Sequence, residues 1–327
     1  MSRLWHRRQY PAMYNTFCKG VGIIPVRCLC YCVVDGRDMM IKVIGNAIHM
    51  IPDTGMWNEN APGTNEHTLI AGSNTLRGQI NGPGRLARFS EITDICVDLD
   101  NILLICDFGN NVIRFMDLTP PYTVETMCGN GAAMNVELLE ARFQGPRSIC
   151  IDGKNNIYIS DHGKNCIHKI NSIRENMSVL FDNSMVLHSY YGDAQLMSRC
   201  VMNRPSKLRI QNNKHLIVLN NHTNTIFKIS LTTTQYQPRI WCSIVKYDLP
   251  SLKNFDVAKN GDILICGAGQ MDRVSFYKIL SDGTQVHLAE LAAKNGQVID
   301  DMQIRSRCYP DLMCFDTMHQ TLSSSGT

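Results

Sequence analysis

The stretch ARFQGPRSICIDGKNNIYISDHGKNCIHKI, residues 141–170, contains three short apolar runs, at residues 148–151, 157–160 and 166–170. Polar turns rich in Gly, Asn and Asp separate these runs. Short runs rich in Ile and Tyr between such turns are typical of strands in an antiparallel meander. We therefore expect three consecutive strands in this segment.

The same unit recurs along the chain. Stronger or weaker copies begin near Cys28, Ala87, Ser198, Phe255 and Ser306. An Arg that opens the unit occurs at positions 88, 142, 199 and 307, in steps of 54, 57 and 108 residues, the last being twice 54. A period in the mid-fifties, with three recognisable strands and room for a fourth, is the size of one propeller blade. The repeat predicts an all-β fold, a six-bladed β-propeller.

This unit resembles the NHL repeat. In that family an Arg-Phe opening precedes a strand that ends in Asp, and a second strand ends in Asp-x-Gly-Asn. Residues 107–110 and 161–165 carry this pattern well, and residues 220–224 carry it loosely. The resemblance covers about residues 26–316 and implies an NHL-type propeller. NHL propellers include protein scaffolds, RNA readers and a few enzymes, so the resemblance implies no particular activity.

The chain divides into a basic N-terminal head, residues 1–25, and the propeller, residues 26–327. Long inter-blade loops are expected at about residues 52–85, 182–197 and 232–250. The last blade is incomplete, because its third strand would begin beyond residue 327. An incomplete blade leaves unpaired sheet edges, so we expect the N-terminal head to supply a closing strand.

Composition and charge exclude some classes of protein. The 32 basic and 29 acidic residues give a net charge of +3, which is below the basic excess of a dedicated nucleic-acid module. No apolar run approaches the roughly 18 residues that span a bilayer. Residues 1–34 are basic and contain no acidic residue, which is also the pattern of a mitochondrial presequence.

Several of the 14 cysteines recur at equivalent strand positions: Cys96, Cys150 and Cys314 near the end of the first strand, and Cys106 and Cys266 at the end of the second. A Cys that recurs in this way is a small hydrophobe packed between blades. Equivalent positions in different blades also lie too far apart for a disulfide. We therefore expect buried free thiols, no metal, no cofactor, and a reducing intracellular compartment. The cytoplasm is expected, with the mitochondrion as the alternative.

The repeat also separates scaffold residues from binding residues. Residues that recur at equivalent positions are expected to brace neighbouring blades through Arg–Asp pairs. They are Arg88, Arg142, Arg199, Arg307, Asp107 and Asp161. In a four-stranded blade, the loop between strands two and three emerges on the same face as the inter-blade loop. Partner-binding candidates on this face, unique to one blade, are Arg85, Arg147, His162, Lys164, Arg204, His222, Asp272, Arg273, Trp57, Tyr190 and Tyr191, with Asn221 and Met271 beside them.

No catalytic motif is found in the sequence. A Gly-x-Ser-x-Gly elbow, a His-Glu-x-x-His motif and a phosphate-binding Gly loop are all absent, so no catalytic residue is assigned. The predicted function is a non-catalytic binding platform that recognises a protein partner through the loop-rich face. Single-stranded RNA on the same face is the alternative, because cationic and aromatic side chains together also bind it. A metal-dependent, lactonase-like hydrolase is the second alternative.

Overall fold

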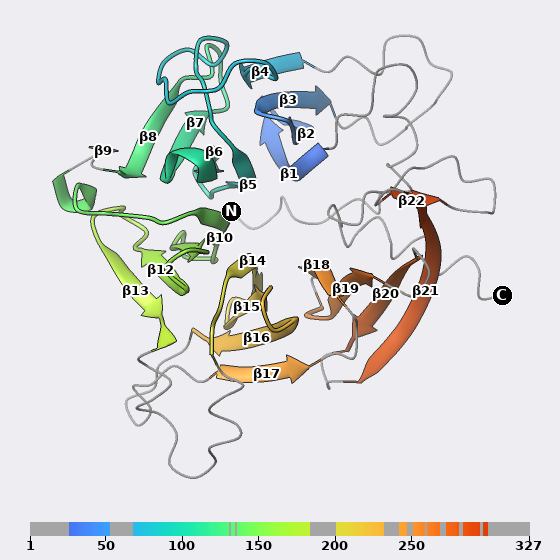
Figure 1. Cartoon of the computed structure of the whole chain (residues 1–327). Coiled ribbons are helices and arrows are strands. Elements are labelled where there is room, and N and C mark those ends of the chain that lie inside the picture. The colour runs from blue at the N-terminus through green and yellow to red at the C-terminus, as the bar shows by residue number, and fades with distance from the viewer. Residues whose placement is uncertain are drawn as a thin grey trace. The chain divides into compact units, whose positions relative to one another are not determined.

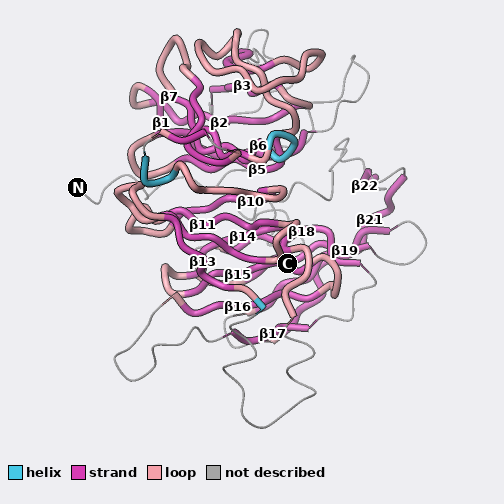
Figure 2. The backbone as a smooth tube through the Cα atoms, turned by 60° about the vertical axis from the view of Figure 1, so that its left-hand side comes forward, coloured by secondary structure: helices cyan, strands magenta, loops and turns pink. Residues whose placement is uncertain are grey.

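The computed structural model describes residues 26–52, 68–130, 132–134, 136–183, 201–231, 242–246, 251–258, 260–268, 273–280, 284–294 and 297–299. Strands and short loops make up nearly all of this part of the chain (Figure 2). The helical segments include η1 (Phe108–Asn110) and η2 (Val136–Leu138), each one turn long. The prediction of an all-β chain is confirmed. In the described residues, no helix has the length and apolar character that a membrane span requires.

The strands of the described residues form five antiparallel sheets, which we call blades 1 to 5. Blade 1 is β1 (Val26–Val34), β2 (Arg37–Ile44), β3 (Ala47–Pro52) and β4 (Thr68–Gly72). Blade 2 is β5 (Ile92–Val97), β6 (Ile102–Asp107), β7 (Val112–Asp117), β8 (Val124–Gly129) and β9 (Ala132–Ala133). Blade 3 is β10 (Pro146–Ile151), β11 (Ile157–Asp161), β12 (Cys166–Ile170) and β13 (Met177–Phe181). Blade 4 is β14 (Pro205–Gln211), β15 (His215–Asn220), β16 (Thr225–Ser230) and β17 (Cys242–Lys246).

Every blade is a meander, because each strand is hydrogen bonded to the next one in the sequence. Blades 1 to 4 belong to one compact unit, in which the first strands of successive blades pack side by side. Strand β1 contacts β5, β5 contacts β10, and β10 contacts β14 (Figure 1). This is the arrangement of consecutive propeller blades.

Blade 5 belongs to a second compact unit. It comprises β18 (Ser251–Val257), β19 (Ile263–Ala268), β20 (Arg273–Ile279), β21 (Gln285–Lys294) and β22 (Gln297–Ile299). The described residues thus hold five blades, where the repeat count predicted six. The predicted sixth blade would begin near Ser306, and both this segment and the N-terminal head expected to close it lie outside the described residues.

The core lies between the blades rather than within one of them. One buried cluster combines residues of blades 1 and 2, such as Ile41 and Phe89, and a second combines blades 2 and 3. A third combines blades 3 and 4. The middle strands of blades 2 and 3 are therefore covered on both faces, which explains why β11 is buried at every residue.

Eight cysteines whose side chains the structure describes are free, and most of them are buried, as predicted. The buried ones are Cys28, Cys32, Cys106, Cys128, Cys150 and Cys166. Burial raises the pKa of the Cys96 and Cys128 thiols to about 12, so these groups stay protonated at neutral pH. They pack as small apolar side chains.

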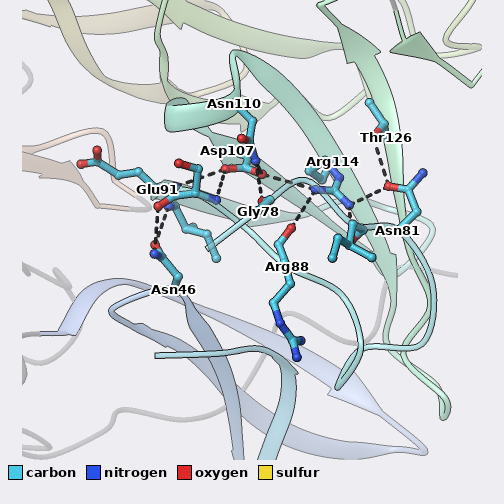
Figure 3. A network of polar contacts seen from close by, with 12 residues as sticks. Asn46, Gly78, Asn81, Arg88, Glu91, Asp107, Asn110, Arg114 and Thr126 are labelled. Atoms are coloured by element: carbon cyan, nitrogen blue, oxygen red, sulfur yellow. Dashed lines mark hydrogen bonds and ion pairs between the residues drawn. The ribbon is translucent and has the colours of Figure 1, made fainter. Parts of the chain in front are cut away.

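Arg88 and Arg142, the two recurring Arg residues that the structure describes, do not pair with Asp107 or Asp161, contrary to the prediction. Arg88 donates from Nη1 to the carbonyl oxygens of Arg85 (2.8 Å) and Ala87 (2.7 Å), within its own loop. Arg142 likewise donates to carbonyl oxygens of its own loop. Asp107 instead accepts hydrogen bonds from the backbone N–H of Ser90 and from the buried Arg114 (Figure 3). Arg199 and Arg307 lie outside the described residues.

Arg114 is fully buried and binds blade 2 to the loop that precedes it (Figure 3). Its Nη2 donates to the carbonyl of Ile80 (3.0 Å) and to Asn81 Oδ1 (2.6 Å), and its Nη1 lies 3.3 Å from Asp107 Oδ2. The guanidinium also lies 5.3 Å from the ring centroid of Phe89. Charge and hydrogen bonds together offset the cost of burying this cation.

The buried pair formed by Asp107 and Arg114 has different residues at the equivalent positions of the next two blades. The equivalent positions, seven residues apart, hold Asp107 with Arg114, Asp161 with His168, and Asn220 with Phe227. In blade 4 the Arg of blade 2 is replaced by Phe, and the carboxylate is replaced by the amide of Asn220. A buried carboxylate without a cation is costly, so the amide avoids an unpaired charge beside Phe227.

Candidate functional site

A pocket of about 350 Å³ lies where blade 3 meets blade 4, and we call it the rim pocket. Its lining residues are Arg147, His162, Arg204, Asn221 and His222. Arg147 lies on β10, His162 follows β11, Arg204 precedes β14, and the last two follow β15. Strands β10 and β11 both contact β14, so these strand ends are brought together by the packing of the two blades.

Arg147 is positioned by an aromatic ring of the preceding blade. Its guanidinium carbon lies 5.8 Å from the ring centroid of Phe108 in η1, and the His162 ring lies 6.5 Å from the same ring in an edge-to-face arrangement. Such a cation–π contact orients the guanidinium without using its N–H groups. Among the described residues, the Arg147 side chain makes no hydrogen bond or ion pair, so its donors remain for a ligand.

His162 is held in one tautomer. Its Nδ1 lies 3.4 Å from the carbonyl oxygen of Pro205, and a carbonyl only accepts, so Nδ1 carries the proton. In the neutral ring Nε2 is then an acceptor. Burial lowers the pKa of His162, and the charge of Arg147 lowers it further. The ring is therefore neutral at pH 7 and can gain a proton when negative charge enters the pocket.

Arg204 has a left-handed backbone, with φ of +56°, which is uncommon for a residue with a long side chain. Its backbone N–H donates to Asn165 Oδ1 at 2.7 Å, and its carbonyl accepts from the N–H of Asn221 at 3.4 Å. The side chain is exposed and, within the described part of the chain, has no partner. Asn221 Oδ1 accepts from the Ser206 hydroxyl, which leaves the Asn221 amide hydrogens as donors.

No carboxylate lines the rim pocket. The adjacent acid, Asp161, is fully buried and accepts hydrogen bonds from the backbone N–H groups of Gln144 and Lys164. The pocket thus presents two permanent positive charges with unused N–H donors. Guanidinium groups in this state bind carboxylates and phosphates through paired, charge-assisted hydrogen bonds.

The structure brings together four of the predicted partner-binding residues, namely Arg147, His162, Arg204 and His222. Asn221, which was predicted to lie beside these candidates, also lines the pocket. Other candidates lie elsewhere. Lys164 donates from Nζ to the Arg142 carbonyl at 2.7 Å, and Arg85 lies exposed before blade 2. Arg273 begins β20 in the second unit, and the candidates outside the described residues are Trp57, Tyr190, Tyr191, Met271 and Asp272.

A second polar cluster lies on the first strands of blades 2, 3 and 4. Asp94 on β5 is buried and accepts a hydrogen bond from the hydroxyl of Ser148 on β10. Lys207 Nζ and Arg209 Nη1 on β14 lie 3.0 and 3.6 Å from its carboxylate oxygens. Burial alone would raise the pKa of Asp94, but the two cations and Ser148 outweigh burial and lower it. The cluster ties blades 2, 3 and 4 together.

In the part of the chain that the structure describes, neither this cluster nor the cysteines form a catalytic arrangement. Ser148 is fully buried, and its hydroxyl also accepts from the N–H of Leu208. Cys166 Sγ and Asp161 Oδ2 approach the same nitrogen of His168, at 3.3 and 3.5 Å, whereas a triad uses both ring nitrogens. Burial raises the pKa of Cys166 to about 12, the opposite of an activated nucleophile. In the described residues, no group of three His, Cys, Asp or Glu side chains could hold a metal ion.

Comparison with known proteins identifies the fold. No protein-family model matches the chain, and no curated protein matches it. The chain is similar to the solved structure of an auxiliary nutrient binding protein from Bacteroides ovatus, with a TM-score of 0.54 and 10% identity over 84% of this chain and 60% of that one. It is also similar to a gluconolactonase from Xanthomonas campestris, with a TM-score of 0.51 and 11% identity over 81% of this chain and 76% of that one.

A virginiamycin B lyase from Staphylococcus aureus is similar as well, with a TM-score of 0.50 and 11% identity over 84% of this chain and 72% of that one. The lyase and the gluconolactonase are β-propeller proteins, so the chain has a β-propeller fold. At this level of identity the likeness shows the fold alone.

Proposed function

We propose that this propeller, of the NHL type, is a non-catalytic platform that recognises a protein partner by binding an anionic group of that partner in the rim pocket. The observation that supports this most is the pair Arg147 and Arg204, which line one pocket without a carboxylate beside them. Arg is among the residues that dominate the energy of protein interfaces. The NHL assignment rests on the turns at residues 107–110 and 161–165.

Single-stranded RNA is the second candidate, because the same two guanidinium groups would also bind backbone phosphates. An RNA complex would weaken steeply as salt is raised, since each neutralised phosphate releases counterions. A lactonase-like hydrolase draws support only from the fold of some similar structures. Fold likeness does not favour an enzyme over a platform, since propellers serve both roles.

Capture of the tagged chain's partners from its native cells tests the proposal, with half of each sample treated with nuclease. The site variant is R147A/R204A. Its matched control is R37A/K154A, which also removes two exposed positive charges but lies outside the pocket. Proteins that survive nuclease, and that bind the unchanged chain and the control but not the site variant, would support the platform. Capture that is lost with nuclease would favour RNA, and capture unchanged in R147A/R204A would overturn the role of the pocket.

A further inference from the structure

The charge of the rim pocket indicates how much negative charge its ligand carries. Arg147 and Arg204 supply two permanent positive charges to the pocket that they line with two His rings and an Asn amide. A carboxylate or a nucleic-acid phosphodiester carries a single negative charge. A phosphorylated Ser or Thr carries about −1.5 to −2 at pH 7. The phosphomonoester is therefore the ligand whose charge matches both guanidinium groups.

The number of N–H donors in the pocket also favours a phosphoryl group over a carboxylate. Each guanidinium carries five N–H donors in a planar fork, and the Asn221 amide adds donors beside them. A carboxylate offers two oxygens, which one fork satisfies. A phosphoryl group offers three terminal oxygens, which two forks approaching from different blades can share. The pocket volume of about 350 Å³ is also larger than a carboxylate requires.

The scaffold orients one of the two guanidinium groups and fixes the backbone that carries the other. Arg147 is held against Phe108, which belongs to blade 2, and the backbone of Arg204 is held by Asn165, which belongs to blade 3. A guanidinium that is already oriented, as that of Arg147 is, loses less conformational freedom on binding, which favours affinity. Three blades therefore contribute to one anion site.

From these observations we infer that the rim pocket is a receptor for the phosphoryl group of a phosphorylated Ser or Thr in a protein partner. This inference rests on the proposed function and specifies its ligand. Recognition of phosphorylated segments by clustered Arg is an established mode of peptide binding. Binding would then be switched by phosphorylation of the partner, because the unmodified hydroxyl offers neither the charge nor the acceptors that the pocket requires.

The test measures binding of the full chain to a degenerate peptide pool with a central phosphoserine, by fluorescence anisotropy. The same pool with Ser or Glu at that position, inorganic phosphate, and a single-stranded RNA oligonucleotide are the comparison probes. We expect the phosphoserine pool to bind at least about tenfold more tightly than the Glu pool. R147A/R204A should lose this preference, and R37A/K154A should retain it.

Equal binding of the phosphoserine and Glu pools would overturn the inference. So would inorganic phosphate that binds as tightly as the peptide pool, or RNA that binds more tightly. Phosphatase treatment of the cell extract separates the inference from the proposed function. Partner capture that depends on Arg147 and Arg204 but resists phosphatase would retain the platform and overturn the phosphoryl ligand. Capture abolished by phosphatase supports both.

Discussion

The side-chain oxygen of Asn165 accepts a hydrogen bond of 2.7 Å from the backbone N–H of Arg204, so a turn of blade 3 fixes the first residue of the rim pocket on blade 4. Asn111 makes the same bond, also of 2.7 Å, to the N–H of Gly145 one blade earlier. Both Asn residues have a left-handed backbone, with φ of +57° and +56°, which Asn tolerates better than most residues. The recurring Asn therefore joins blade 2 to blade 3 and blade 3 to blade 4, and the candidate site depends on the second of these hydrogen bonds.

Replacement of Asn165 by Gly tests the hydrogen bond between Asn165 and the Arg204 N–H. Gly tolerates the left-handed backbone but removes the acceptor of the Arg204 N–H, so we expect a loss of about 1–3 kcal/mol in the free energy of unfolding. Affinity for phosphate should fall as well, because Arg204 loses its anchor. Urea unfolding and phosphate titration measure the two effects. Asn101→Gly is the control, since Asn101 also has a positive φ but makes no side-chain hydrogen bond within the described residues. Equal effects of the two variants would contradict the assignment.

The repeat made much of the rim pocket predictable from the sequence. Equivalent turn positions can be aligned by the period, and a residue such as His162 then stands out because the other blades hold different side chains there. The pairing of Asp94 with Lys207 was not predictable in this way. These residues are 113 positions apart, and a repeat does not indicate which charges on adjacent first strands will meet. Arg88 was wrongly paired with Asp107 because spacing alone does not distinguish it from Arg114.

The pair Asp107 and Arg114 should be replaceable by the neutral pair of blade 4. Arg114→Phe alone leaves the buried Asp107 without its cation, and breaking such a pair costs about 3–5 kcal/mol. In the double variant D107N/R114F, which copies Asn220 and Phe227, we expect a loss smaller than the sum of the two single losses by about 1 kcal/mol or more. A double-mutant cycle in urea measures this. Additive losses would show that the blade-to-blade change is not compensatory.

The acid dependence of Arg114→Phe gives a second check on this pair. Burial raises the pKa of Asp107 despite its hydrogen bonds and Arg114, so the folded state takes up a proton more readily than the unfolded state. Loss of Arg114 should raise this pKa further. The charged carboxylate destabilises the folded state fully above the folded pKa, and this destabilisation decreases as the pH falls through that pKa. The stability deficit of R114F relative to the unchanged chain should therefore shrink between pH 7 and pH 5.

Anion binding in the rim pocket should strengthen as the pH falls. The pKa of His162 is lowered by burial and by Arg147, and a bound dianion should raise it, so binding takes up a proton. Arg204 lowers this pKa further, whereas Asp161 and the Pro205 carbonyl raise it. Sulfate is the appropriate probe because it stays dianionic between pH 8 and pH 5.5. We expect its affinity to rise over this range in the unchanged chain, and less in His162→Gln. An NMR titration of the imidazole, with and without sulfate, reports the shift directly.

The buried thiols should resist alkylation in the folded chain. Burial raises the pKa of Cys106 and Cys150 well above the usual range, and the reactive form of cysteine is the thiolate. Iodoacetamide at pH 8 should therefore modify these residues in urea but not in buffer, as read by peptide mass spectrometry. Rapid labelling of Cys106 in the native chain would contradict the packing of blades 2 and 3.

Asp94→Asn should be among the most destabilising single changes in the larger unit. The carboxylate is buried and accepts from Ser148 while it faces Lys207 and Arg209, so an amide there leaves two cations without their anion. Removing one member of such a group costs about 3–5 kcal/mol.

The effect of D94N should also depend on pH. Because the pKa of Asp94 is lowered in the folded state, the contribution of its carboxylate to stability is present above the unfolded pKa and is lost as the pH falls through the folded pKa. The difference in unfolding free energy between the unchanged chain and D94N should therefore shrink as the pH is lowered from 7 to 3, whereas the exposed control Asp38→Asn should change little at either pH. A difference that stays constant over this range would mean that the ion pairs do not carry the stability of the cluster.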